Sequence, residues 1–83
     1  MEAPVKKILE HIELNPKIMR GKPIIKGTRL TVQFILNLLA NGSTFEEIEK
    51  EYEGVTKEDI LACLLYASEA LDNSTFMPLE EAV

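Results

Sequence analysis

The sequence predicts a mainly α-helical domain, in which three helices with a helix-turn-helix corner follow a short strand and a basic turn region. Two observations carry this prediction. Apolar residues recur at helical spacing in three segments of residues 31–71, and the connections between those segments are short and contain glycine. At 83 residues and 46% hydrophobic composition, the chain supports one compact core, so residues 1–83 are expected to form a single domain.

Residues 11–29 are predicted to form a short strand followed by two basic turns. The segment that ends at Leu14 fits either the apolar stripe of a helix or, in its last residues, the alternation of a strand. Because Asn15-Pro16 is a turn signal, we expect a strand at about His11–Leu14. Two further turn signals, each built around a glycine, bracket Ile24-Ile25, which is too short to form a sheet by itself.

The first helix is predicted between Thr31, a suitable N-terminal cap, and Asn41-Gly42, where glycine supplies a left-handed residue. Its apolar residues have the i, i+3, i+4, i+7 spacing of one helical face: Val32, Ile35, Leu36 and Leu39. Phe34 and Leu38 add a second stripe. The apolar face is therefore wider than one core contact needs, and we expect this helix to be central or shared with a partner.

The second and third helices are predicted from their caps and from the turn between them. Thr44 and Glu47 have the capping-box spacing, with Ser43 and Glu46 as a competing pair. Thr56 caps the third helix, with Asp59 as its partner three residues later, and Glu53-Gly54-Val55-Thr56 is the turn. The third helix carries an apolar stripe made of Ile60, Leu64, Ala67 and Leu71. The bundle is thus expected over residues 31–71, followed by a tail at residues 72–83.

Charge is distributed unevenly along the chain. Residues 1–29 carry seven bases and three acids, a net charge of +4, whereas residues 30–83 carry two bases and eleven acids, a net charge of −9. Within residues 15–29 there are five bases and no acid. These bases are either solvated surface residues or an anion-contact site opposite an acidic body.

Composition and residue inventory argue against catalysis, metal binding and membrane insertion. His11 is the only histidine and is expected to be a surface residue, and Cys63 is the only cysteine and is expected to be a buried, inert thiol. One histidine and one cysteine do not make a closed zinc site, so we expect no catalytic residue, metal or cofactor. The segment Gly21–Thr28 resembles a phosphate loop only superficially, because Lys26 precedes Gly27. With no secretory leader and no long apolar run, we expect a cytoplasmic protein.

If the chain binds DNA, the basic turns are expected to supply the contacts. Glu58 and Asp59 occupy the first turn of the third helix, where carboxylates would face phosphate and be repelled, although they also suit the helix dipole. The predicted DNA-binding residues, which mainly contact phosphates, are Lys17, Arg20, Lys22, Lys26, Thr28 and Arg29. Two alternatives remain open: Thr28 closes the turn before the first helix, and Arg29 pairs with an acid of the second helix.

The chain resembles the prokaryotic family called domain of unknown function 433 over about residues 11–68. The most specific residues of the resemblance are Gly21-Lys22-Pro23 and Gly27-Thr28-Arg29, with further agreement at Asn15-Pro16 and Leu39-Ala40-Asn41-Gly42-Ser43. The resemblance implies a homeodomain-like three-helix domain and, for many members, an antitoxin of the VapB type whose partner is a PIN-domain ribonuclease toxin. The chain departs from the family near Glu53, where a proline is common, and at Arg20, where a second glycine is common.

Together these features lead to two functional hypotheses. The first is the antitoxin of a type II toxin–antitoxin pair that acts as a homodimer and binds both operator DNA and a PIN-domain toxin, with the apolar residues of the tail, Phe76, Met77 and Leu79, docking into the partner. The alternative is an acidic protein–protein adaptor that uses the helix-turn-helix fold without binding DNA, a possibility favoured by the net charge of −5.

Overall fold

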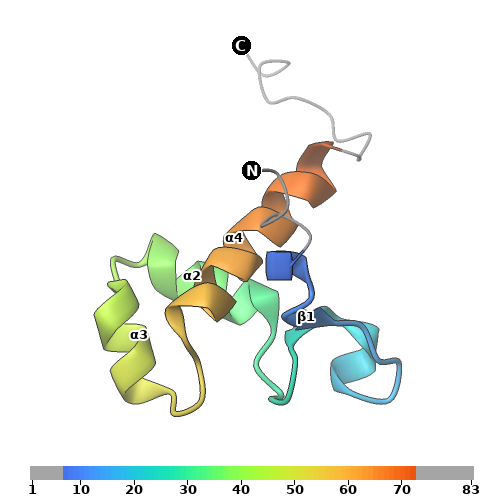
Figure 1. The fold of residues 1–83 in the computed structure, drawn as a ribbon, viewed down its shortest axis with the longest axis horizontal. Helices are drawn as coiled ribbons and strands as arrows, with labels where there is room; N and C mark the ends of the chain where they lie inside the picture. The colour runs from blue at the N-terminus through green and yellow to red at the C-terminus, as the bar shows by residue number, and fades with distance from the viewer. Residues whose placement is uncertain (1–6, 73–83) are drawn as a thin grey trace.

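The computed structural model describes residues 7–72, which form a mainly helical domain with one small sheet (Figure 1). After a helical turn at residues 7–9, the elements are strands β1 (Ile12–Glu13) and β2 (Ile24–Ile25) and helices α2 (Val32–Ala40), α3 (Phe45–Glu51) and α4 (Lys57–Asp72), with a 3₁₀ turn at Met19–Gly21 between the strands. The three helices predicted between residues 31 and 71 are confirmed. Among the described residues, no helix has the length and apolar character to cross a bilayer.

Side-chain caps begin all three main helices, as predicted. The Thr31 hydroxyl accepts a hydrogen bond from the Phe34 amide at 3.0 Å. In α3 the capping box uses Thr44 and Glu47, whose side chains each accept from the other residue's backbone amide at 3.1 and 2.9 Å. These caps satisfy amide groups that have no partner inside the helix, so each beginning is fixed by residues close in sequence.

The two strands pair antiparallel, with Ile12 opposite Ile25 and Glu13 opposite Ile24. On its other side β2 contacts the chain that leads into α2, because the Ile25 amide donates to the Leu30 carbonyl at 2.9 Å. The strand predicted at residues 11–14 is confirmed in its central two residues, and among the described residues of this segment only 7–9 are helical. Two residues suffice for β2 because neighbouring backbone lies along both of its edges.

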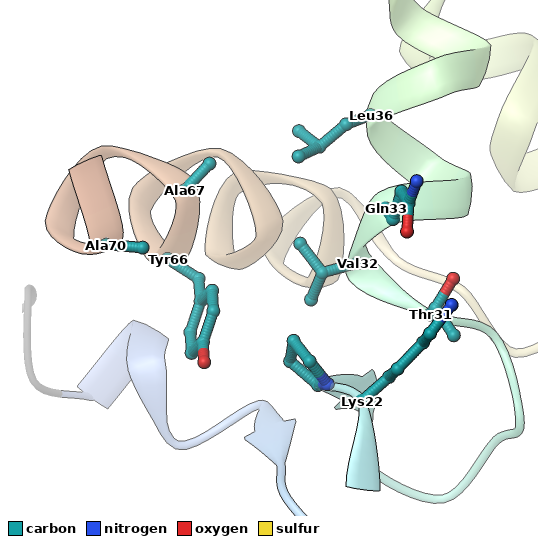
Figure 2. A pocket seen from close by; sticks show the side chains of 9 residues that line it. Lys22, Thr31, Val32, Gln33, Leu36, Tyr66, Ala67 and Ala70 are labelled. Carbon is teal, nitrogen blue, oxygen red and sulfur yellow. The ribbon is translucent and has the colours of Figure 1, made fainter. Parts of the chain in front are cut away.

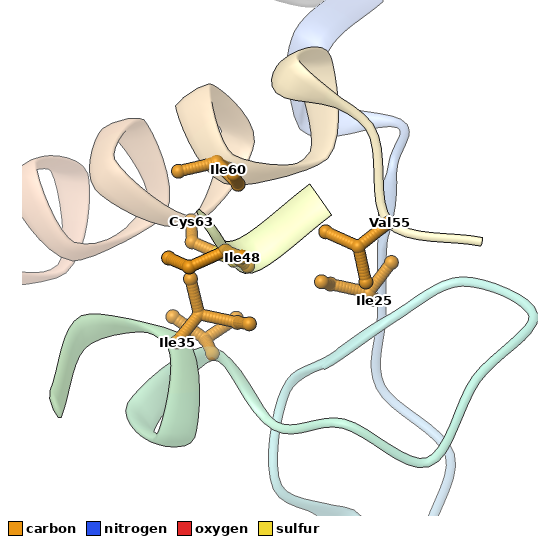
Figure 3. Close-up of a cluster of buried hydrophobic side chains, with 7 residues drawn as sticks. Ile25, Ile35, Ile48, Val55, Ile60 and Cys63 are labelled. Atoms are coloured by element: carbon orange, nitrogen blue, oxygen red, sulfur yellow. The ribbon is translucent and has the colours of Figure 1, made fainter. Parts of the chain in front are cut away.

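The hydrophobic core lies between the sheet and the three helices (Figure 3). Its buried members come from β2, the three helices and the connection between α3 and α4: Ile25, Val32, Ile35, Ile48, Val55, Ile60 and Cys63. The predicted apolar stripe of α4 is buried only where it begins, because Leu64 is 40% exposed and Leu71 is 63% exposed. The reason is geometric: the C-terminal part of α4 extends past the rest of the domain (Figure 1).

Candidate functional site

The predicted DNA-binding bases lie in one exposed segment around the small sheet. We call Lys17, Arg20, Lys22, Lys26 and Arg29 the basic strip; all five are exposed. Within residues 7–72, none of the five pairs with a carboxylate. The alternative in which Arg29 pairs with an acid of α3 is therefore not observed. Because an exposed, unpaired cation keeps its charge available to solvent, the basic strip can attract anions from outside the molecule.

The first of the two turns that carry the basic strip, at residues 15–21, has a strained backbone. The Asn15 side chain accepts from the Lys17 amide at 2.9 Å, and the Asn15 carbonyl accepts from the Ile18 amide at the same distance. Met19, Arg20 and Gly21 then follow in the left-handed region, with φ values of 49°, 59° and 81°. A non-glycine residue in this region costs roughly 1–2 kcal/mol. Arg20 therefore occupies a position that glycine would fill without strain.

Replacing Arg20 by glycine is expected to raise the free energy of unfolding while lowering the positive charge of the basic strip. The expected gain relative to Arg20→Ala is about 1 kcal/mol, because alanine retains the Cβ that makes the left-handed conformation costly. The two variants lose the same charge; they differ in this strain and in the greater entropy of glycine in the unfolded chain, which offsets part of the strain relieved. Urea unfolding measures the difference, and an Arg20→Gly variant no more stable than Arg20→Ala would contradict the proposed strain.

The second turn of the basic strip is closed by Thr28. Gly27, at φ +87°, allows a tight turn in which the Thr28 amide donates to the Ile25 carbonyl at 3.0 Å. The Thr28 hydroxyl donates to the same carbonyl at 2.9 Å and accepts from the Leu30 amide at 3.0 Å. The only donor hydrogen of the hydroxyl is thus used within the turn, which agrees with the alternative that Thr28 closes the turn before the first helix. A direct contact from Thr28 to DNA stays a prediction and would use the remaining lone pair.

The first turn of α4 is less acidic at its surface than the sequence suggests. Asp59 is only 7% exposed, so the expectation that it faces phosphate is wrong, while Glu58 is exposed. One oxygen of Asp59, Oδ2, accepts from the Thr56 amide at 2.9 Å, and the Asp59 amide donates back to the Thr56 hydroxyl at 3.2 Å. The carboxylate is therefore turned inward, where it caps its own helix.

His11 is the second partner of that carboxylate. Its Nδ1 donates to Asp59 Oδ1 at 2.7 Å, and its side chain is 38% exposed. The histidine expected at the surface is therefore half-buried and paired, and it ties the residue before β1 to the beginning of α4. Sequence reasoning missed this pair because 48 positions separate the two residues and no local pattern links them.

Cys63 is the buried, inert thiol that the sequence predicts. It is 0% exposed, and burial, together with the nearby charge of Asp59, raises the pKa of the thiol to about 12. The thiolate is the nucleophile and the metal ligand, so a thiol held in its protonated form does neither near neutral pH. The residues predicted for partner docking, Phe76, Met77 and Leu79, lie outside the described residues.

Comparison with known proteins gives a family and a solved relative. The family model described as "Protein of unknown function (DUF433)" matches residues 12–67, more than half of the chain. A crystal structure of a DUF433 member from Anabaena variabilis ATCC 29413 is 25% identical and superimposes with a TM-score of 0.72, covering 83% of this chain and 68% of that one. No curated protein matches. On the strength of the family match, which contains all of the basic strip, the chain belongs to the DUF433 family.

Proposed function

We propose that this protein is the antitoxin of a type II toxin–antitoxin pair, which binds operator DNA and a PIN-domain ribonuclease as a homodimer. The observation that carries the proposal is the exposed basic strip, in which no base pairs with a carboxylate of residues 7–72. In the proposed arrangement α2, α3 and α4 are a homeodomain-like bundle. The corner between α3 and α4 is supported by the short connection between Glu51 and Lys57, in which Gly54 has φ +95°.

The basic strip is proposed to act on phosphates and not on base edges. Flexible lysine and arginine side chains on turns position a protein on the duplex without reading its sequence. A homodimer would present ten such bases, and each phosphate contact contributes roughly −0.9 to the slope of log affinity against log salt concentration. The inward orientation of Asp59 supports the proposal, because it removes one carboxylate from the surface that approaches DNA.

A titration with duplex DNA over a range of salt concentrations tests this proposal. We expect steep loss of binding with salt in the native protein, and a slope that is shallower by about one for each phosphate contact removed in Lys22→Ala or Arg29→Ala. Lys50→Ala and Lys57→Ala are matched controls, since both remove one exposed lysine outside the basic strip. Absence of binding at low salt, or equal effects of all four substitutions, would contradict a role for the basic strip.

The toxin partner is proposed from the family resemblance and the apolar tail. It is tested separately, by looking for a short ribonuclease gene beside the gene for this chain and by co-purifying its product with the full-length protein. Loss of co-purification in Phe76→Ala and Leu79→Ala is the expected result if the tail docks into the toxin. If the protein binds DNA but has no neighbouring ribonuclease gene, the proposed role of the basic strip stands and the antitoxin role is contradicted.

The second candidate function is an acidic adaptor that binds a protein and not DNA. It is favoured by α3, on which four glutamates face solvent: Glu46, Glu47, Glu49 and Glu51. We propose a non-enzymatic role under both functions, since Cys63 is buried and the His11 Nδ1 is engaged by Asp59. The DNA titration decides between the two, because the adaptor requires no binding to the duplex even at low salt.

A further inference from the structure

An apolar groove lies between α2 and the C-terminal half of α4. Figure 2 shows Val32 and Leu36 of α2 facing Tyr66 and Ala67 of α4, with Ala70 at one end of the groove and Lys22 at the other. The hollow has a volume of about 260 Å³. It is smaller than the roughly 300–1,000 Å³ typical of small-molecule sites, and its walls offer few polar groups for orienting a ligand.

The chemistry of the groove specifies the kind of segment that fits it. Small side chains on α4, Ala67 and Ala70, leave room for large apolar side chains from elsewhere. At the opposite end the Lys22 ammonium is exposed and, within residues 7–72, unpaired with any carboxylate. A complementary occupant is a short peptide segment with large apolar residues first, at the α4 end, and an acid last, beside Lys22.

We propose that the occupant is the C-terminal segment of the same chain, residues 76–81. Its order matches the groove: Phe76-Met77-Pro78-Leu79 is apolar, and Glu80-Glu81 is acidic. Its origin also matches, because α4 ends at Asp72, two residues beyond Ala70. The turn-forming residues Asn73 and Ser74 come next, and the four residues from Asp72 to Phe76 span up to roughly 14 Å, which allows the chain to reverse onto the groove.

Docking of the tail in its own groove has a consequence for the basic strip and for partners. Glu80 and Glu81 would stand beside Lys22 and reduce its attraction for other anions. If the protein is the proposed antitoxin, a toxin that takes Phe76, Met77 and Leu79 must first displace them from the groove. The intramolecular contact does not depend on that function, and its test uses neither DNA nor toxin.

The test is an NMR measurement on the full-length chain with labelled alanine methyl groups. We expect nuclear Overhauser contacts from the Phe76 ring to the methyl groups of Ala67 and Ala70. We also expect both methyl resonances to shift in Phe76→Ala, because an aromatic ring shifts the nuclei near its face. Val83→Ala is the matched control, since it shortens an apolar tail residue outside the proposed segment and should leave both resonances in place.

A second sample separates contact within one chain from contact between two chains. Chains with labelled alanine methyl groups are mixed with an excess of fully deuterated chains, whose rings carry no protons to give a contact, so only contacts within a chain keep their full intensity. Undiminished contacts between Phe76 and Ala67 support the proposal. The proposal is overturned if Phe76→Ala leaves the resonances of Ala67 and Ala70 unchanged. It is also overturned if the contacts weaken on dilution, because the occupant of the groove would then be a second copy of the chain.

Discussion

Replacing Ile25 by alanine is expected to lower the free energy of unfolding by about 2–5 kcal/mol, the usual cost of truncating a fully buried isoleucine. Typical domains are stable by only about 5–15 kcal/mol, and a chain of this size belongs near the lower end. Ile25 is 1% exposed and contacts the core cluster from β2. The alanine variant therefore removes a large fraction of the stability of the domain.

The same substitution is expected to disturb the basic strip, because Ile25 holds its second turn. The Ile25 carbonyl accepts from both the amide and the hydroxyl of Thr28, and the Ile25 amide donates to Leu30. The side chain anchors this backbone in the core, while the turn places Lys26 and Arg29 in solvent. Loosening the anchor gives the two bases more positions to sample, so binding of an anion would fix them at a higher entropic cost.

Urea unfolding monitored by circular dichroism measures the effect. Ile25→Val retains most of the buried volume and is expected to cost about 0.5–1.5 kcal/mol. Leu14→Ala truncates the residue directly after β1, which is 61% exposed, and we expect a change within about 0.5 kcal/mol. An Ile25→Ala variant as stable as the Leu14→Ala control would show that β2 is not anchored in the core.

Features of the fold that depend on residues a few positions apart could be predicted from the sequence. The caps at Thr31, Thr44 and Thr56 use partners three residues later, and the turn at Asn15-Pro16 uses atoms two and three residues away. A local pattern carries the full information for such contacts, because their geometry is the same in any fold. The basic strip could also be predicted, because a count of charges along the sequence finds five bases and no acid within residues 15–29.

Features that depend on tertiary placement could not be predicted from the sequence. The apolar period of α4 is equally regular at Ile60 and at Leu71, yet one is buried and the other exposed, because the body of the domain ends between them. The sequence also does not distinguish an exposed Arg29 from one paired with an acid of α3. Likewise, the conformation of Arg20 is imposed by the turn around it, against the preference of the residue itself.

Asp59→Ala is the second substitution with a large expected effect, a loss of about 2–5 kcal/mol in the free energy of unfolding. The carboxylate caps α4 through Thr56, a contribution of about 0.5–2 kcal/mol, and also accepts from His11 at 2.7 Å. A hydrogen bond to a charged group contributes about 1.5–3 kcal/mol, and this one is largely shielded from water on the Asp59 side. The substitution removes both contributions at once.

Two control variants separate the contributions of Asp59. Glu58→Ala removes the adjacent, exposed acid from the same helical turn, and we expect a change of at most about 0.5 kcal/mol. Glu47→Ala removes the equivalent acid from the exposed capping box of α3, so its cost measures a box without a buried partner. The amount by which Asp59→Ala exceeds Glu47→Ala then approximates the contribution of His11.

A double-mutant cycle with His11→Ala tests that assignment directly. If the pair ties the residue before β1 to α4, the two substitutions are less than additive, with a coupling energy of at least about 0.5 kcal/mol. Additive effects would mean that the contact at 2.7 Å contributes nothing to stability and that Asp59 acts only as a cap. Because 48 positions separate the residues, a measured coupling also shows that a contact between the residue before β1 and α4 contributes to the stability of the domain.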